Sequence, residues 1–402
     1  MRPVIVKIEG NYYDSQIYRG RLYLWHFDGR LSVYNWNELI DSIIDDEYVQ
    51  LAINLSLTDG ALLYHSYAYD RLMTDKDVRH IVKDKLQKIA NRTFYIKQSQ
   101  LENFVIKEYD VPTGELPIET LIYDNTLYYA TDKGVFKSSV HKNAPVSATK
   151  RPNKFWDCRV VSMNIGYGDM SFSAAYEGLW ELDVRRGSLC TEPKQLTAKH
   201  SSFANYTYAS IFNTSLMDES FMLYDEPIFE KLLAQRQRNL TSISEENIFG
   251  IKSGSALKWG VKDKLYRVDN GNLMGVKFDN YYQHHEYNRD AQRFANLFDK
   301  YDTGGANRRV IGGGAGYFGT IIEYEDGLLI LQSDGEKLEI NEDVTRWRVF
   351  TRSINYENQL HVILDDSLCI YAFLHDYELV QREKIMGILY SEKNGIKKDC
   401  SI

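Results

Sequence analysis

Two stretches of the sequence combine residue types used at ligand sites. Gly314 to Gly319 reads Gly-Ala-Gly-Tyr-Phe-Gly, a spacing used by dinucleotide-binding loops, in which the last glycine opens a helix whose free amides hold the pyrophosphate. Thr320 to Leu331 reads instead as two β runs around a turn, which favours a glycine-rich strand. His284-His285-Glu286 offers metal ligands, but neighbours on a strand point to opposite faces. The sequence therefore predicts no cofactor and no metal site.

Histidine and aspartate pairs near the C-terminus supply acid and base groups. His361 lies near Asp365-Asp366, and His375 precedes Asp376. Their spacing links them to no nucleophile, and the sequence contains neither a Gly-x-Ser-x-Gly elbow nor a phosphate-binding P-loop. Catalysis is therefore less favoured than a non-enzymatic role, although a fold that gathers distant carboxylates or histidines in one pocket would still form an active site.

The most distinctive charged segment runs from Lys133 to Trp156 and holds six Lys and Arg residues with no Asp or Glu. Two prolines mark the part after Val140 as irregular. Cations beside aromatic residues are typical of surfaces that bind phosphate groups, single-stranded nucleic acid or acidic proteins. A solvated connection between strands is the alternative. The candidate partner-binding or phosphate-binding residues are Lys142, Lys150, Arg151, Lys154 and Trp156.

A second basic motif is Arg346-Trp347-Arg348-Val349-Phe350-Thr351-Arg352. On a strand, alternation places Arg346, Arg348 and Arg352 on one face. If this strand is the innermost of its sheet, these cations approach a central channel and could bind an anion. The alternative is that they form salt bridges to neighbouring sheets.

Charge and composition limit the partners. The chain has 48 Lys and Arg against 56 Asp and Glu, a net charge of −8, so nucleic acid or an anionic membrane would have to bind a local patch. The apolar runs are too short for a membrane helix or a signal-peptide core. Four cysteines without Cys-x-x-Cys spacing suit a reducing compartment. We expect a soluble cytoplasmic protein that needs no membrane and has a protein partner, with nucleic acid as a second partner class at 133–156.

The elements that must position these residues are β-hairpins. Aromatic residues make up 13% of the chain and suit pleated sheets. Apolar runs are separated by turn dipeptides that supply a positive φ, namely Asp28-Gly29, Asp59-Gly60, Lys133-Gly134, Glu177-Gly178, Asn270-Gly271, Asp326-Gly327 and Asp334-Gly335. Residues 128–136 and 172–180 align at an offset of 44, which superposes both their turn and their packing face.

A repeat of this length with several short strands resembles the β-propeller superfamily, in the WD40-like and YVTN-like arrangement of blades, without a specific family motif. The resemblance implies an all-β, seven-bladed β-propeller, although the spacing would also accommodate six or eight blades. A two-sheet sandwich is the competing arrangement. We expect the blades near 15–36, 103–140, 156–190, 203–226, 246–279, 309–340 and 345–374. The strand Val4–Ile8 would pair either beside Leu379–Leu389 or with the last blade, and either pairing would close the ring.

Four segments change from β periodicity to helical periodicity. Apolar stripes predict amphipathic helices near 37–47, 74–90, 227–238 and 288–301. Asn37, Thr74 and Pro227 are the expected helix starts. We predict one propeller domain over 1–390 with these helices inserted, followed by a C-terminal tail, 391–402.

These features favour a non-catalytic protein-interaction scaffold or sensor subunit of a larger cytoplasmic assembly, which presents loops and a basic segment to a macromolecular partner. The alternative function is that of a propeller hydrolase or lyase with an axial active site. Perturbed titratable groups clustered in one pocket would favour the enzyme.

Overall fold

The internal contacts of the chain divide it into two compact units. One unit comprises Met1–Leu116 and Ala315–Ile402, and the other comprises Pro117–Gly314. The computed structural model describes residues 2–44, 46–59, 67–109, 115–140, 153–166, 168–185, 192–207, 210–225, 240–251, 256–278, 294–303, 308–332, 335–353 and 355–374. The predicted helix at 227–238 and the tail 391–402 lie outside these residues.

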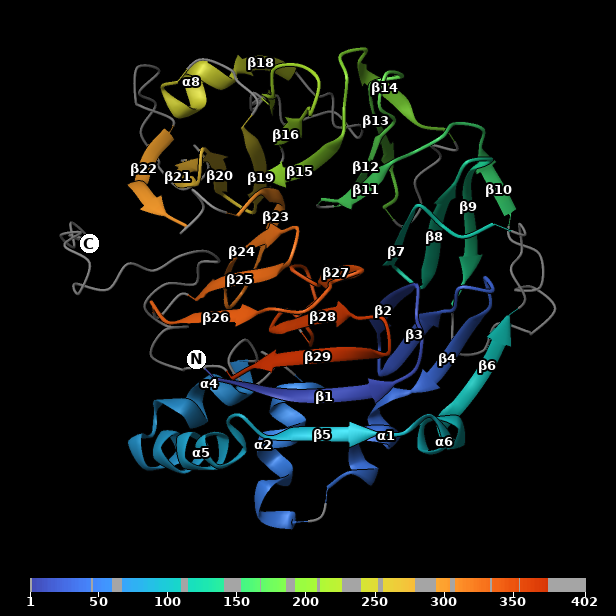
Figure 1. The fold of residues 1–402 in the computed structure, drawn as a ribbon, viewed down its shortest axis with the longest axis vertical. Helices are drawn as coiled ribbons and strands as arrows, with labels where there is room; N and C mark the ends of the chain where they lie inside the picture. Colours follow the sequence, from blue (N-terminus) through green and yellow to red (C-terminus); the bar gives the residue numbers. More distant parts are fainter. Residues whose placement is uncertain are drawn as a thin grey trace. The chain divides into compact units, whose positions relative to one another are not determined.

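The described strands form seven sheets, the blades of a seven-bladed β-propeller (Figure 1). The sheets of Pro117–Gly314 comprise β7 (Glu119–Tyr123), β8 (Thr126–Thr131), β9 (Gly134–Ser139) and β10 (Asn153–Trp156); β11 (Ser162–Ile165), β12 (Asp169–Ser173), β13 (Leu179–Asp183) and β14 (Lys194–Thr197); β15 (Phe203–Thr207), β16 (Ser210–Thr214), β17 (Phe221–Asp225) and β18 (Leu240–Ser244); and β19 (Leu257–Val261), β20 (Lys264–Asp269), β21 (Asn272–Phe278) and β22 (Phe294–Asp302).

Three further sheets complete the set. They comprise β2 (Asp14–Tyr18), β3 (Arg21–Trp25), β4 (Leu31–Asn35) and β6 (Val105–Tyr109); β23 (Val310–Gly316), β24 (Gly319–Tyr324), β25 (Gly327–Gln332) and β26 (Lys337–Ile340); and β27 (Arg346–Val349), β28 (Gln359–Ile363), β29 (Ser367–Phe373), β1 (Pro3–Glu9) and β5 (Thr93–Ile96). The glycine-rich stretch is therefore the end of β23 and the start of β24, not the start of a helix.

The turn dipeptides position these hairpins. Gly29, Gly134, Gly178 and Gly271 each join the second and third strands of a sheet with φ between 73° and 120°. A Cβ at Gly178 would lie 2.1 Å from the Thr197 carbonyl oxygen, so this turn also needs glycine for space. At Asp59-Gly60 the first residue follows a helix and not a strand, and Gly60 lies outside the described residues.

The two ends of the described chain share one sheet. Strand β1 pairs antiparallel with β29, with Val6 opposite Ile370. Val4, Val6 and Ile8 alternate along β1 and are fully buried. Of the two predicted partners of the N-terminal strand, the last blade is confirmed, and 379–389 lies outside the described residues.

A helical insertion separates β4 from β6. It contains α1 (Trp36–Ser42), α2 (Glu47–Leu57), α4 (Tyr67–Thr74), α5 (Lys76–Ile89), α6 (Gln98–Leu101) and the 3₁₀ turn η1 (Glu102–Phe104). The predicted caps are shifted by one or two residues. Asn35, not Asn37, caps α1, and Asp75, not Thr74, caps α5 by accepting hydrogen bonds from the amides of Asp77 and Val78. Strand β5, also in the insertion, pairs in parallel with β1 and thereby fastens the insertion to the last blade.

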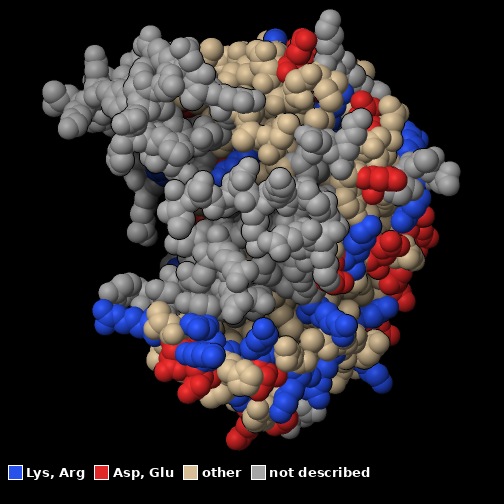
Figure 2. Space-filling view, turned by 90° about the vertical axis from the view of Figure 1, so that its left-hand side faces the viewer, with Lys and Arg blue, Asp and Glu red and all other residues tan. Residues whose placement is uncertain are grey.

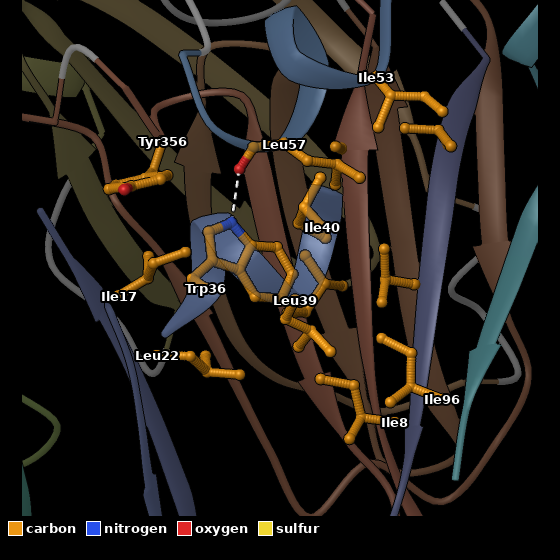
Figure 3. Packing of buried hydrophobic residues seen from close by; sticks show 14 of the residues in the cluster. Ile8, Ile17, Leu22, Trp36, Leu39, Ile40, Ile53, Leu57, Ile96 and Tyr356 are labelled. Atoms are coloured by element: carbon orange, nitrogen blue, oxygen red, sulfur yellow. Dashed lines mark hydrogen bonds between the residues drawn. The ribbon is translucent and has the colours of Figure 1, made fainter. Parts of the chain in front are cut away.

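Trp36 anchors the insertion in the core (Figure 3). Its side chain is fully buried, and its Nε1–H donates to the Leu57 carbonyl at 2.7 Å. Side-chain amides satisfy the last carbonyls of α2, since Gln359 donates to Leu57 and Asn358 donates to Ser56. The end of α2 is therefore bonded to β28 and the residue before it.

One predicted helix is wrong where the structure describes it. Residues 294–301 of the segment 288–301 lie in β22, which pairs antiparallel with β21. The pairing includes two register shifts, and such irregularity breaks the strict two-residue alternation from which a strand is recognised. The structure adds a short helix that the sequence analysis missed, α8 (Glu245–Phe249), capped by Ser244.

Candidate functional site

Arg346 and Arg348 lie on one face of β27, as predicted, and both contact Asp14 at the start of β2. Arg348 binds the Asp14 carboxylate with Nε and Nη2 at 2.9 and 2.7 Å, and Arg346 Nη1 lies 3.1 Å from Asp14 Oδ2. Asp14 is fully buried, while the two arginine side chains keep 23% and 16% of their surface. This contact therefore matches the alternative in which the arginines form salt bridges to a neighbouring sheet. Arg352 lies in the exposed turn after β27 and so does not continue its alternation.

A serine and a histidine meet close to this ion pair, since Ser15 follows Asp14 and His361 lies opposite Arg348 in the sheet. Ser15 Oγ lies 3.0 Å from His361 Nδ1, and His361 Nε2 lies 3.3 Å from Gln359 Oε1. The amide oxygen can only accept, so Nε2 carries the proton and Nδ1 accepts from the serine. Both side chains are buried, at 0–1% exposure. A serine nucleophile must be reached by its substrate, so this pair joins two sheets and does not form an open catalytic dyad.

The burial of His361 should make the folding stability of the protein sensitive to acid. Desolvation lowers the pKa of His361 to about 3, and the Asp14 charge acts in the opposite direction. The unfolded chain binds a proton near pH 6.5 that the folded chain does not bind, so folding stability should fall as the pH drops from 6.5 toward 3. The loss from this residue should approach about 1.4 kcal/mol per pH unit below pH 6, where the unfolded histidine is almost fully protonated. Urea unfolding at pH 7, 6 and 5 measures it. The variant His361→Gln lacks this titrating group, so its free energy of unfolding should depend on pH less steeply, by the equivalent of about one proton. Equal pH dependence in the two proteins would contradict the assignment of this acid sensitivity to His361.

The basic segment predicted at 133–156 is described only in part. Lys142, Lys150 and Arg151 lie outside the described residues. Lys154 is on β10 and pairs with Asp157, and Trp156 packs against Phe172 and Trp180 with ring centroids 5.3 and 5.2 Å apart. Trp156 thus contributes to packing between two blades.

Cys158, next to this segment, has the wrong environment for a nucleophile. Burial raises its pKa, and the Glu177 and Asp157 carboxylates raise it further. A reactive cysteine needs a lowered pKa, because the thiolate is the attacking species. The described residues also contain no group of three His, Cys, Asp and Glu side chains arranged to hold a metal ion.

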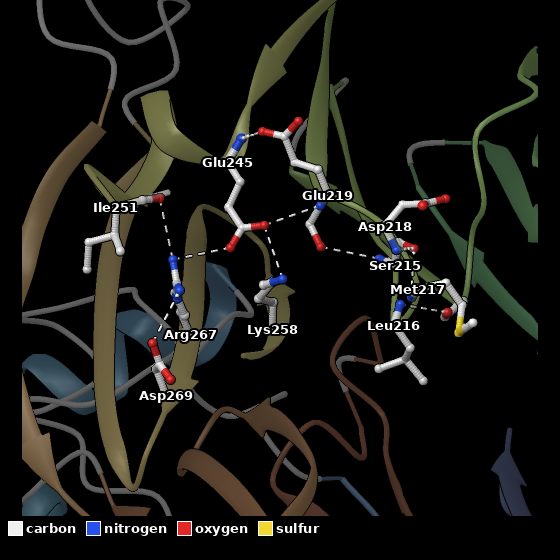
Figure 4. A network of polar contacts seen from close by, with 12 residues as sticks. Ser215, Leu216, Met217, Asp218, Glu219, Glu245, Ile251, Lys258, Arg267 and Asp269 are labelled. Atoms are coloured by element: carbon white, nitrogen blue, oxygen red, sulfur yellow. Dashed lines mark hydrogen bonds and ion pairs between the residues drawn. The ribbon is translucent and has the colours of Figure 1, made fainter. Parts of the chain in front are cut away.

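A buried ion network, which the sequence analysis missed, joins α8 to β19 and β20 (Figure 4). Glu245 Oε2 lies 3.1 Å from Lys258 Nζ, and Glu245 Oε1 lies 3.2 Å from Arg267 Nη1. All three side chains are at most 2% exposed. Glu245 Oε2 also accepts from the Ser220 amide at 3.3 Å, so the network holds one end of the β16–β17 turn.

Large apolar side chains stand exposed on the loops of the two neighbouring sheets β11–β14 and β15–β18. Tyr176, Leu216 and Met217 are 74%, 67% and 65% exposed; we call them the loop patch. Tyr176 is in the β12–β13 turn, and the other two are in the β16–β17 turn. Because successive strands of an antiparallel sheet run in opposite directions, the β12–β13 and β16–β17 turns emerge at the same end of their sheets as the β14–β15 connection. The Ala175–Ser201 backbone bridge joins the first turn to that connection.

The helical insertion carries a second exposed surface. Residues 76–97 hold seven Lys and Arg against two Asp. Leu72 and Ile81 are 52% and 53% exposed beside them. The lower part of Figure 2, where α4 and α5 lie, shows Lys and Arg side chains among Asp and Glu. Among the described residues, no helix is both long enough and apolar enough to cross a bilayer.

Comparisons with known proteins establish the fold. No family model and no curated protein matches the sequence. The β-propeller domain of Myceliophteria thermophila Cps50 (Swd1) is 8% identical with a TM-score of 0.52, covering 91% of this chain and 97% of that chain. A streptogramin B lyase structure is 9% identical with a TM-score of 0.49, covering 92% and 97%. Identity this low shows the fold alone, and one fold hosts many functions.

Proposed function

We propose that this chain is a non-catalytic protein-interaction scaffold or sensor subunit of a larger cytoplasmic assembly. The observation that carries the proposal is a contrast between buried and exposed groups. The polar groups best suited to chemistry, such as Ser15 with His361 and Glu245 with Lys258, are buried against their own partners. Among the described residues, the four most exposed large apolar side chains, Tyr95, Tyr176, Leu216 and Met217, stand on loops and on the insertion. Such residues are typical of docking surfaces.

The basic segment and the β27 arginines remain part of the proposal. Lys142, Lys150 and Arg151 would add an electrostatic contact to a phosphate-bearing or acidic partner. Arg346 and Arg348, already neutralised in part by Asp14, would serve a sensor by exchanging that carboxylate for a bound anion.

The alternative is a propeller hydrolase or lyase with an axial active site. It needs a perturbed acid or base that a substrate can reach. Burial raises the pKa of Glu323 on β24, which makes this carboxyl the acid we would substitute first. A Glu323→Gln variant that retained every in vivo phenotype of the chain would argue against the enzyme.

The scaffold proposal is tested on the chain at its native expression level. We expect an affinity-tagged chain to sediment well above its 46.8 kDa and to retain a stoichiometric protein partner after washing in moderate salt. The charge-reversed variant Lys150→Glu/Arg151→Glu/Lys154→Glu should lose part of that partner while its melting temperature is unchanged. A chain that sediments as a monomer and retains no stoichiometric protein would contradict the proposal.

A further inference from the structure

We propose that the loop patch, Tyr176 with Leu216 and Met217, is the docking surface for a peptide segment of a protein partner, one that pairs apolar side chains with flanking Lys or Arg. This inference rests on the proposed scaffold function and names its surface and the chemistry of its ligand.

His200 connects the two turns that carry the three side chains. The Tyr176 and His200 rings lie 4.9 Å apart in an edge-on contact, and His200 Nδ1 lies 2.9 Å from Ser215 Oγ. Ser215 directly precedes Leu216 and Met217. A chain of contacts therefore runs from the exposed tyrosine to the exposed leucine and methionine, across two blades.

The turn that carries Leu216 and Met217 is held in place. Ser215 Oγ accepts from the amides of Met217 and Asp218 at 3.2 and 2.8 Å, and the Leu216 amide donates to Ser202 Oγ at 3.1 Å. At its other end, the Ser220 amide is bonded to the buried Glu245 (Figure 4). A turn ordered in advance loses little conformational entropy on binding, so burial of its apolar side chains contributes more fully to affinity.

The charges around the loop patch select the partner. The segments 174–178, 198–202 and 215–220 hold three carboxylates, Glu177, Asp218 and Glu219, against one lysine. That lysine, Lys199, lies over the Phe221 ring at 4.9 Å. Carboxylates repel nucleic acid phosphates and anionic lipids, and they attract Lys and Arg. The apolar centre with an acidic rim thus fits a basic and apolar peptide, because a hydrophobic core with polar surroundings is how protein interfaces are built.

The test selects peptides from a random 12-residue phage library on the immobilised full-length chain and measures their affinities by fluorescence anisotropy. We expect selected peptides to combine apolar residues with Lys or Arg. Leu216→Ser/Met217→Ser should weaken them about tenfold or more, as for truncated interface anchors. The matched control, Leu72→Ser/Ile81→Ser, changes two exposed apolar residues on the insertion and should leave the affinity unchanged. Asp218→Lys should weaken the same peptides, with unaltered melting temperature.

The inference would be overturned by selected peptides of net negative charge, by peptides that bind Leu216→Ser/Met217→Ser as tightly as the parent, or by a selection that yields no binder. Peptides that depend on Leu72 and Ile81 would also overturn it, but they would leave the scaffold proposal standing. The scaffold proposal fails separately, when the native chain sediments as a monomer without a partner.

Discussion

Replacing Glu245 by alanine should cost about 3–5 kcal/mol of folding stability, the usual cost of removing one partner from a buried ion pair. Lys258 and Arg267 are at most 2% exposed, so water cannot replace the lost carboxylate. The loss should appear as a lower urea midpoint and as faster hydrogen exchange in β19 and β20.

The adjacent Glu246 provides the matched control. It follows Glu245 in the first turn of α8 but is exposed. Glu246→Ala removes only a favourable charge near the helix N-terminus, worth about 0.3–1 kcal/mol. If both variants shifted the urea midpoint equally, the buried network would have no special role. Because Glu245 also accepts from Ser220, its loss should additionally loosen the turn that presents Leu216 and Met217.

The second large effect is expected at Trp36. Trp36→Ala should lower the free energy of unfolding by about 3–5 kcal/mol, because it leaves a cavity where a fully buried indole packs. Protection from hydrogen exchange should fall first in α1 and α2, which pack around it. Unfolding in urea, with exchange followed by mass spectrometry, measures both.

Trp36→Phe separates packing from hydrogen bonding at this position. The phenyl ring keeps most of the apolar contact but cannot donate to the Leu57 carbonyl. That carbonyl still accepts from Gln359 Nε2 at 2.9 Å, so it is not left unsatisfied, and the loss should be about 1 kcal/mol beyond the smaller ring volume. A phenylalanine variant as unstable as the alanine variant would show that the hydrogen bond dominates.

Local patterns in the sequence determined the fold of this protein to a large extent. A turn that needs a positive φ is encoded by its own glycine, so Gly134 and Gly178 revealed two equivalent hairpins 44 residues apart. Alternation of Val4, Val6 and Ile8 likewise predicted a strand able to pair with the last blade. These features depend on neighbours within a few residues. Where the local signal was irregular, as in β22 with its register shifts, the prediction failed.

Only the tertiary structure decided which side chains meet. Asp14 binds Arg348 across 334 positions of sequence, and Ser15 reaches His361 across 346. Likewise His200 connects the turns that carry Tyr176 and Leu216 because two blades lie side by side. Glu245 carries no sign in the sequence that it is buried. Charge neutralisation, burial and exposure depend on distances through space, and a single sequence does not encode these in any local period. The strand–turn repeat therefore revealed the architecture, while packing between blades decided which polar groups are enclosed and which apolar ones remain available to a partner.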